Sequence, residues 1–147
     1  MNKSKVIVLY GKRSRGKTTT LNLLIHKLIS SGAAVLSGTP SSRLEENCWV
    51  ILEYQGQKIG IITAGDDEKT LDNYFGQLCI TCDIYICASR TRGSSCRYIE
   101  GHFPGYIMWQ EKWSITEWNG TTMALDLLRN DANEKQASGL IDAIHAL

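Results

Sequence analysis

The stretch that most constrains the fold of this chain is Gly11–Thr20, with the sequence GKRSRGKTTT. Before it, Lys5–Tyr10 is a short apolar run rich in β-branched residues, which predicts a buried strand. After it, Thr18–Ser30 places leucine and isoleucine side chains along one face, which predicts a helix that ends just before Gly32. The sequence therefore predicts a tight glycine turn between a buried strand and a helix.

The turn matches the pattern G-x-x-x-x-G-K-[ST], which is informative because the required strand and helix flank it. Glycine tolerates the backbone conformations that point successive N–H groups inward, and a helix start adds free N–H groups and a positive dipole end. Lys17 would reach the β- and γ-phosphates of a nucleotide, and the Thr18 hydroxyl would hold Mg²⁺. The residues expected to surround the phosphates are Gly11, Lys12, Ser14, Arg15, Gly16, Lys17, Thr18 and Thr19.

Strand and helix patterns alternate along the rest of the chain. The predicted strands are Cys48–Tyr54 and Lys58–Thr63, which form a hairpin, then Asp83–Ala88 and Tyr106–Trp109. The predicted helices are Lys69–Cys79 and a last helix with a capping box at Asp131 and Glu134, whereas Ser37–Ser42 and Ser89–Arg97 are expected to be loops. This alternation predicts one α/β domain over residues 1–147, in three layers, with a mainly parallel sheet and one antiparallel hairpin.

The composition is that of a soluble globular protein, with 43% hydrophobic residues, 21% charged residues and a net charge of +1. This charge gives no general attraction to nucleic acid or to a membrane surface, so anion binding must depend on a local arrangement. The apolar runs are shorter than a membrane span, and we recognise no signal peptide. Five cysteines without the density of a disulfide scaffold predict reduced thiols and a cytoplasmic location.

The glycine turn in its setting resembles that of the P-loop NTPase superfamily, and the alternating elements extend the likeness over most of the chain. The resemblance implies a three-layer α/β/α fold and a site for a nucleoside triphosphate with Mg²⁺. Lys12 adds a likeness to the MinD- and ParA-type ATPases, which carry a signature lysine after the first glycine, although Arg13 and Ser14 replace two glycines of their pattern. In that family the lysine reaches the partner subunit's nucleotide, which implies a homodimer; the alternative is that Lys12 is a solvated charge.

The order of elements is also similar to that of small Ras-like GTPases, in which an antiparallel hairpin is followed by D-T-A-G. Here the hairpin ends in Ile62-Thr-Ala-Gly65, so isoleucine replaces the metal-side aspartate. The guanine-binding motif N-K-x-D is also missing, since Ser89-Arg-Thr-Arg92 follows the next strand. We therefore expect ATP in preference to GTP.

Asp66 and Asp67 are the nearest candidates for the missing carboxylate. Both would lie at the carboxyl ends of the parallel strands, the edge that also holds the glycine turn. We expect Asp66, which follows Gly65, to contact Mg²⁺ or to orient the attacking water. The alternative is that the acidic residues 66–68 cap the next helix.

The basic loop Ser89–Arg97 should lie at the same edge. Arg92 is the preferred member, because the adjacent Gly93 lets the loop bend, and its guanidinium would stabilise charge on a transferring phosphoryl group. Arg90 and Arg97 are the other candidates for holding an anionic acceptor. The alternative is a solvated loop without such a role.

Three functions remain open at this point. The favoured prediction is a small cytoplasmic Mg²⁺-dependent ATPase or ATP-driven switch, with Lys17, Asp66 and Arg92 as its catalytic residues. A nucleotide or small-molecule kinase would use the arginine loop to hold its acceptor. A nucleotide-sensing module with little turnover would bind a protein partner, with the docking surface formed by Trp109, Trp113 and Trp118; the alternative is that these pack in the core or at a capped sheet edge.

Overall fold

The computed structural model describes residues 4–12, 16–78, 80–103, 106–115 and 118–147. Strands and helices alternate along most of the chain, as the sequence pattern predicts. The strands are β1 (Lys5–Tyr10), β2 (Ala34–Gly38), β3 (Trp49–Tyr54), β4 (Gln57–Ile62), β5 (Ile84–Ser89) and β6 (Tyr106–Glu111). The helices are α1 (Lys17–Ser30), α2 (Glu68–Gln77), α3 (Ser94–His102) and α4 (Thr122–Ala146).

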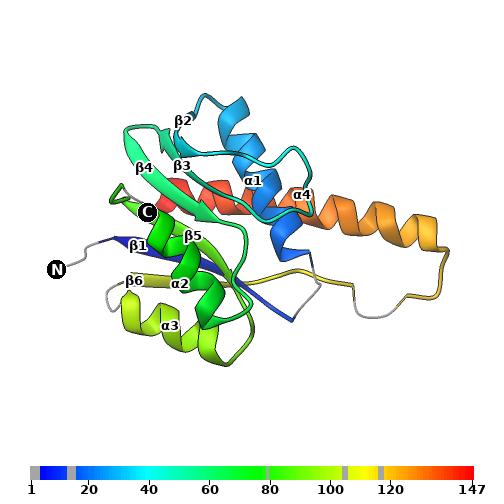
Figure 1. Ribbon diagram of the computed structural model, residues 1–147. Helices are drawn as coiled ribbons and strands as arrows, with labels where there is room; N and C mark the ends of the chain where they lie inside the picture. Colours follow the sequence, from blue (N-terminus) through cyan, green and yellow to red (C-terminus); the bar gives the residue numbers. More distant parts are fainter. Residues whose placement is uncertain (1–3, 13–15, 79, 104–105, 116–117) are drawn as a thin grey trace.

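The strands form one mixed sheet in the order β2-β3-β4-β5-β1-β6 (Figure 1). β4, β5, β1 and β6 run parallel, whereas β3 is antiparallel to both of its neighbours. The predicted α/β class, the mainly parallel sheet and the hairpin between β3 and β4 are confirmed. The antiparallel part is larger than predicted, because β2 adds a third strand to the hairpin.

The last two residues of β2 lie in the stretch Ser37–Ser42, which the sequence pattern predicts to be a loop. The β2 sequence AVLSG is short and largely exposed at the sheet edge, so it shows no buried strand pattern. Its end closely approaches β3: Gly38 has a φ of +80°, and a Cβ there would lie 2.3 Å from the Trp49 carbonyl oxygen. This segment is therefore a strand because it pairs with β3, and its own residue pattern does not predict one.

Helices cover both faces of the sheet, and each face has its own core. The core against α1 and α4 includes the fully buried side chains of Ile7, Leu24, Ile61 and Leu140. The core against α2 and α3 includes those of Val8, Ile62, Leu71 and Ile99. Burial of apolar side chains on both faces leaves the loops at the strand ends as the place for polar chemistry.

Two helices begin where the sequence reading does not place them. α3 starts at Ser94, inside the stretch predicted to be a loop, and it is held by the burial of Tyr98 and Ile99 against the sheet. α4 starts at Thr122, because the Thr121 hydroxyl accepts a hydrogen bond from the Ala124 N–H at 3.1 Å. The predicted capping box at Asp131 is therefore wrong.

Asp131 lies in the interior of α4, where it pairs with Lys135 at 2.9 Å. The error has a physical cause: the first half of α4 extends beyond the sheet (orange in Figure 1), so it lacks the buried face from which a helix is recognised.

Candidate functional site

The parallel strands of the sheet end in register, and this brings distant segments together. Tyr10, the last residue of β1, is aligned with Ser89 of β5 and Glu111 of β6. The segments that begin at Gly11, Arg90 and Lys112 consequently leave the sheet at the same edge. The glycine turn lies in the middle of this edge, as the sequence predicts.

The described part of the glycine turn has the geometry expected where a loop meets a helix start. Gly16 has a φ of +85° in the left-handed region, which a side chain would strain, and its carbonyl accepts the first helical hydrogen bond from the Thr20 N–H at 2.9 Å. Gly11 is buried, Lys12 is exposed, and Thr19 is partly buried. The predicted phosphate-surrounding residues Ser14 and Arg15 lie outside the described residues.

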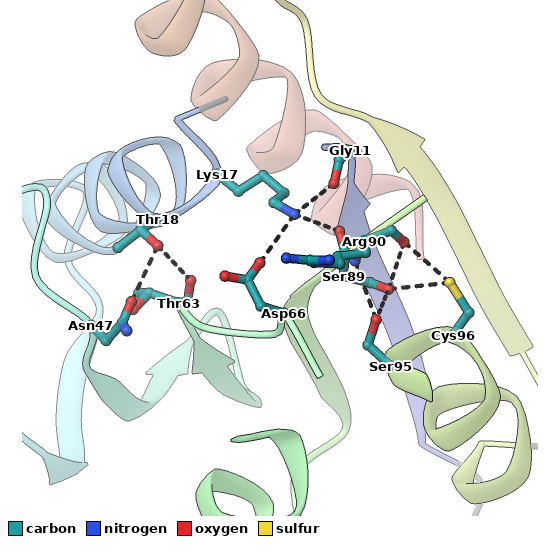
Figure 2. A network of polar contacts seen from close by, with 10 residues as sticks. All are labelled: Gly11, Lys17, Thr18, Asn47, Thr63, Asp66, Ser89, Arg90, Ser95 and Cys96. Atoms are coloured by element: carbon teal, nitrogen blue, oxygen red, sulfur yellow. Dashed lines mark hydrogen bonds and ion pairs between the residues drawn. The ribbon is translucent and has the colours of Figure 1, made fainter. Parts of the chain in front are cut away.

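Lys17 is the centre of the polar network in Figure 2. Its ammonium donates to the carbonyl oxygens of Gly11 at 2.7 Å and of Ser89 at 2.8 Å, and it lies 3.6 Å from a carboxylate oxygen of Asp66. The side chain is only 6% exposed. Burial lowers the pKa of Lys17, and the nearby Asp66 carboxylate opposes this shift. The structure therefore joins the two residues that the sequence reading places in one site.

Gly65 explains how Asp66 reaches Lys17 although β5 separates β4 from β1. A Cβ on Gly65 would lie 1.7 Å from the Ala88 carbonyl oxygen, so the backbone after β4 passes directly against β5. Asp66 is half exposed above this crossing. The next residue, Asp67, caps α2 by accepting a hydrogen bond from the Thr70 N–H at 2.7 Å, and that bond lowers the Asp67 pKa. The two carboxylates thus have separate roles, with Asp66 at the site and Asp67 at the cap.

Ile62, at the position where the Ras-like pattern has an aspartate, cannot contribute to this site. Its side chain is fully buried in the core against α2 and α3, together with Val8 and Leu71. A carboxylate there would be buried in an apolar core, which is unfavourable for a charge.

The Thr18 hydroxyl faces oxygen atoms that the sequence reading did not include. It lies 3.1 Å from the Thr63 carbonyl oxygen and 3.2 Å from the side-chain oxygen of Asn47 (Figure 2). Hydroxyl, carbonyl, amide and carboxylate oxygens are hard ligands that suit Mg²⁺. The oxygen atoms around the Thr18 hydroxyl, and the carboxylate of Asp66, are therefore of the chemical kind that Mg²⁺ prefers.

The predicted arginine loop lies beside Asp66. Arg90 and Arg92 line a cavity of about 280 Å³ together with Asp66 and Asp67. The positive charge of Arg90 also acts to lower the Lys17 pKa, which places Arg90 electrostatically close to the ammonium. Arg92, the preferred residue, thus shares a cavity with Asp66, and so does Arg90, the other arginine expected at this edge.

Lys112 flanks the turn from the other side, and no motif indicates it. Its N–H donates to the Tyr10 carbonyl at 2.7 Å, which extends the pairing of β1 with β6 beyond Glu111. A Cβ on Gly11 would lie 3.2 Å from the Lys112 Cβ, so the side chain packs against the turn, and only 5% of the residue is exposed. Its ammonium donates to the Trp113 carbonyl. Burial lowers the Lys112 pKa to about 8.

Asn133 of α4 completes the surroundings of Gly16. Its side-chain oxygen accepts a hydrogen bond from the Thr20 hydroxyl at 3.2 Å, and it would be 3.3 Å from a Cβ on Gly16. Helix α4, which is distant from the glycine turn in the sequence, therefore packs beside the turn.

The three tryptophans considered as a docking surface are not buried. Trp109 is 37%, Trp113 50% and Trp118 39% exposed, so core packing is wrong, although Trp109 does lie in β6 at the edge of the sheet. Trp109 and Trp113 line different cavities.

Comparison with protein families gives no match for this chain, and comparisons with curated proteins and with solved structures find no similar protein either. Within the described ranges no helix is long and apolar enough to cross a membrane. The same part of the chain contains no group of three or more His, Cys, Asp and Glu residues arranged to hold a metal ion. The cysteines described, which exclude Cys79, are free thiols, as predicted.

Proposed function

We propose that this chain binds a nucleoside triphosphate, preferably ATP, and acts as a Mg²⁺-dependent ATPase or ATP-driven switch of the P-loop type. The observation that carries the proposal is the position of Lys17. Its ammonium lies where β1 and β5 end, held by two carbonyl oxygens and 3.6 Å from Asp66. A buried cation at a helix start, beside a glycine turn, is suited to an anion such as a polyphosphate.

In this proposal the residues around Lys17 have different roles in phosphate binding and in hydrolysis. Lys17 would exchange its carbonyl contacts for phosphate oxygens, which favour its charged form against the burial that lowers its pKa. Thr18 and Asp66 would hold Mg²⁺, which supplies neutralisation of the phosphate charge. Asp66 would also accept a hydrogen bond from the attacking water, and Arg90 or Arg92 would face the terminal phosphate.

Calorimetric titration with MgATP tests the binding step. The protein is expected to bind MgATP, and Lys17→Ala is expected to lower the affinity by at least about tenfold, because a charged hydrogen bond to phosphate is lost. Lys69→Ala is the matched control, since Lys69 is an exposed lysine of α2. Absence of binding of ATP, ADP, GTP and GDP with Mg²⁺ would refute the proposal, and an unchanged affinity in Lys17→Ala would refute the role of Lys17.

Phosphate release under multiple turnover tests the catalytic step. Asp66→Asn is expected to lower kcat by about 10²-fold or more, the size typical of a lost general base. Asp67→Asn is the control, because asparagine caps a helix as well as aspartate does. Tight MgATP binding with turnover no faster than spontaneous hydrolysis would instead support the nucleotide-sensing module.

A kinase is the second candidate, and the cavities around α3 favour it. Arg92 and Gly93 line both the cavity beside Asp66 and a neighbouring cavity of about 560 Å³ that Arg97 and Trp109 also border. An anionic acceptor held there would lie next to the terminal phosphate. Acceleration of ADP release by nucleosides, nucleotides or small metabolites, reduced by Arg97→Ala, would favour transfer over hydrolysis. If no acceptor accelerates ADP release, the kinase is excluded.

A further inference from the structure

A cavity of about 490 Å³ lies on the side of the glycine turn opposite to Asp66. The sheet order fixes these two sides, because Asp66 follows β4, beyond β5, whereas the cavity begins at the end of β6, the neighbour of β1 on its other side. The cavity is lined by Gly16 and Thr19 from the turn and α1, by Lys112 and Trp113 after β6, and by Asp126 and Arg129 of α4. In Figure 1 the first half of α4 and the yellow segment that links it to β6 are the elements that extend beyond the sheet here. The volume is in the range of small-molecule sites.

Consecutive residues of α1 face the two sides of the turn. The Thr18 hydroxyl lies beside Thr63 and Asn47, on the side where Asp66 meets Lys17. Thr19 lines the cavity. A triphosphate that crosses the turn with its terminal phosphate at Lys17 and Asp66 would therefore emerge at its other end beside Gly16 and Thr19, at the entrance of the cavity.

We propose that this cavity binds the nucleoside part of the nucleotide whose phosphates the glycine turn holds. The assignment rests on the proposed function, and it adds the residues that would bind the base and ribose. The residues proposed to bind the base and ribose lie outside the sequence motif, and α4 supplies five residues of the cavity lining: Asp126, Arg129, Asn130, Ala132 and Asn133.

The walls match a nucleoside in chemistry as well as in volume. Trp113 is half exposed and the adjoining Ile115 is partly buried, so the cavity offers an aromatic surface on which a base can stack. Asp126 is the one carboxylate among the described residues that line the cavity, and it can accept a hydrogen bond from an amino group of the base. Arg129 and Asn130 supply donors for ring nitrogens or ribose hydroxyls.

Lys112 orients the ligand in this cavity. Its buried ammonium lies against the turn, where its Cε would be 3.6 Å from a Cβ on Gly16, and in the described structure it donates to a backbone carbonyl. A charged group so poorly hydrated favours a nearby anion. The α-phosphate end would consequently lie at Lys112, and the base would lie outward, between Trp113 and α4.

Calorimetry with two probes separates this cavity from the phosphate site. Magnesium tripolyphosphate reports the glycine turn alone, and MgATP reports the turn together with the cavity. The unmodified protein is expected to bind MgATP at least about tenfold more tightly than magnesium tripolyphosphate, the size of one stacked base. Trp113→Ala and Asp126→Ala are expected to remove most of this difference while they change the tripolyphosphate affinity by less than about twofold.

Asp142→Ala is the matched control for Asp126→Ala, because Asp142 is an exposed aspartate of the same helix that does not line the cavity. It is expected to leave both affinities unchanged. Equal affinities for MgATP and tripolyphosphate in the unmodified protein, or unchanged MgATP affinity in both cavity variants, would overturn the cavity assignment and leave the proposed function standing. Failure of both probes to bind would overturn the two together.

Discussion

Lys112 is the residue whose replacement gives the most quantitative test of this structure. Its ammonium is buried with a backbone carbonyl as acceptor, and burial lowers its pKa from 10.5 to about 8. A shift of one pKa unit corresponds to about 1.4 kcal/mol, so the buried charge destabilises the folded state at neutral pH by up to about 3 kcal/mol. We predict that Lys112→Met, which keeps the length of the side chain without the charge, unfolds with a higher free energy than the unmodified protein at pH 7.

The sign of the pH dependence follows from where the proton is bound. Below pH 8 both the folded and the unfolded state hold the Lys112 proton, and the full destabilisation is present. Between pH 8 and 10.5 the folded state releases this proton first, so the unfolded state binds more protons and stability rises with pH. The advantage of Lys112→Met should therefore shrink by about 1.4 kcal/mol by pH 9 and by about 2.5 kcal/mol by pH 10.

Urea unfolding at pH 7, 8, 9 and 10, followed by tryptophan fluorescence, measures this difference. Comparison of the two proteins at each pH cancels the titration of other groups, such as Tyr98, whose pKa burial raises to about 12. Lys69→Met, at an exposed position of α2, is the control and should show no such trend. If the stability difference between Lys112→Met and the unmodified protein stays constant from pH 7 to pH 10, the conclusion that burial lowers the Lys112 pKa is refuted.

Three further predictions concern the site's support and its partner. Gly65→Ala should abolish folding or lower the melting temperature strongly, since the added Cβ would lie 1.7 Å from the Ala88 carbonyl oxygen; a normal melting curve would contradict the close crossing over β5. Asp67→Ala should lower the free energy of unfolding through loss of the cap on α2, whereas Asp67→Asn should not; equal effects in chemical denaturation would contradict the cap. If exposed Lys12 acts as the signature lysine of a dimeric ATPase, ATP should drive dimerisation in sedimentation experiments and Lys12→Ala should prevent it, whereas a monomer at all ATP concentrations would leave Lys12 as a solvated charge.

The strand–turn–helix unit could be predicted from the sequence because it depends on neighbours in the chain. Apolar runs, glycines and a helix pattern are adjacent in Lys5–Ser30, and the structure places β1 and α1 within one residue of the prediction. The proximity of Asp66 to Lys17 was also predictable, since parallel strands bring their carboxyl ends to one edge. The sequence also favours Asp66 over Asp67, and the structure supplies a separate role for Asp67, which caps α2.

The sequence by itself determined a glycine turn between a strand and a helix, with its lysine and its hydroxyl, because these are local features of backbone and charge. Only the tertiary structure decided what surrounds them. Lys112, Asn47 and Asn133 come from segments far apart in the chain, and they reach the turn because sheet register and the packing of α4 place them there. Long-range packing buries Lys112 beside Gly11 and places α4 at the cavity. Such packing leaves no periodic or motif signal in the residues themselves.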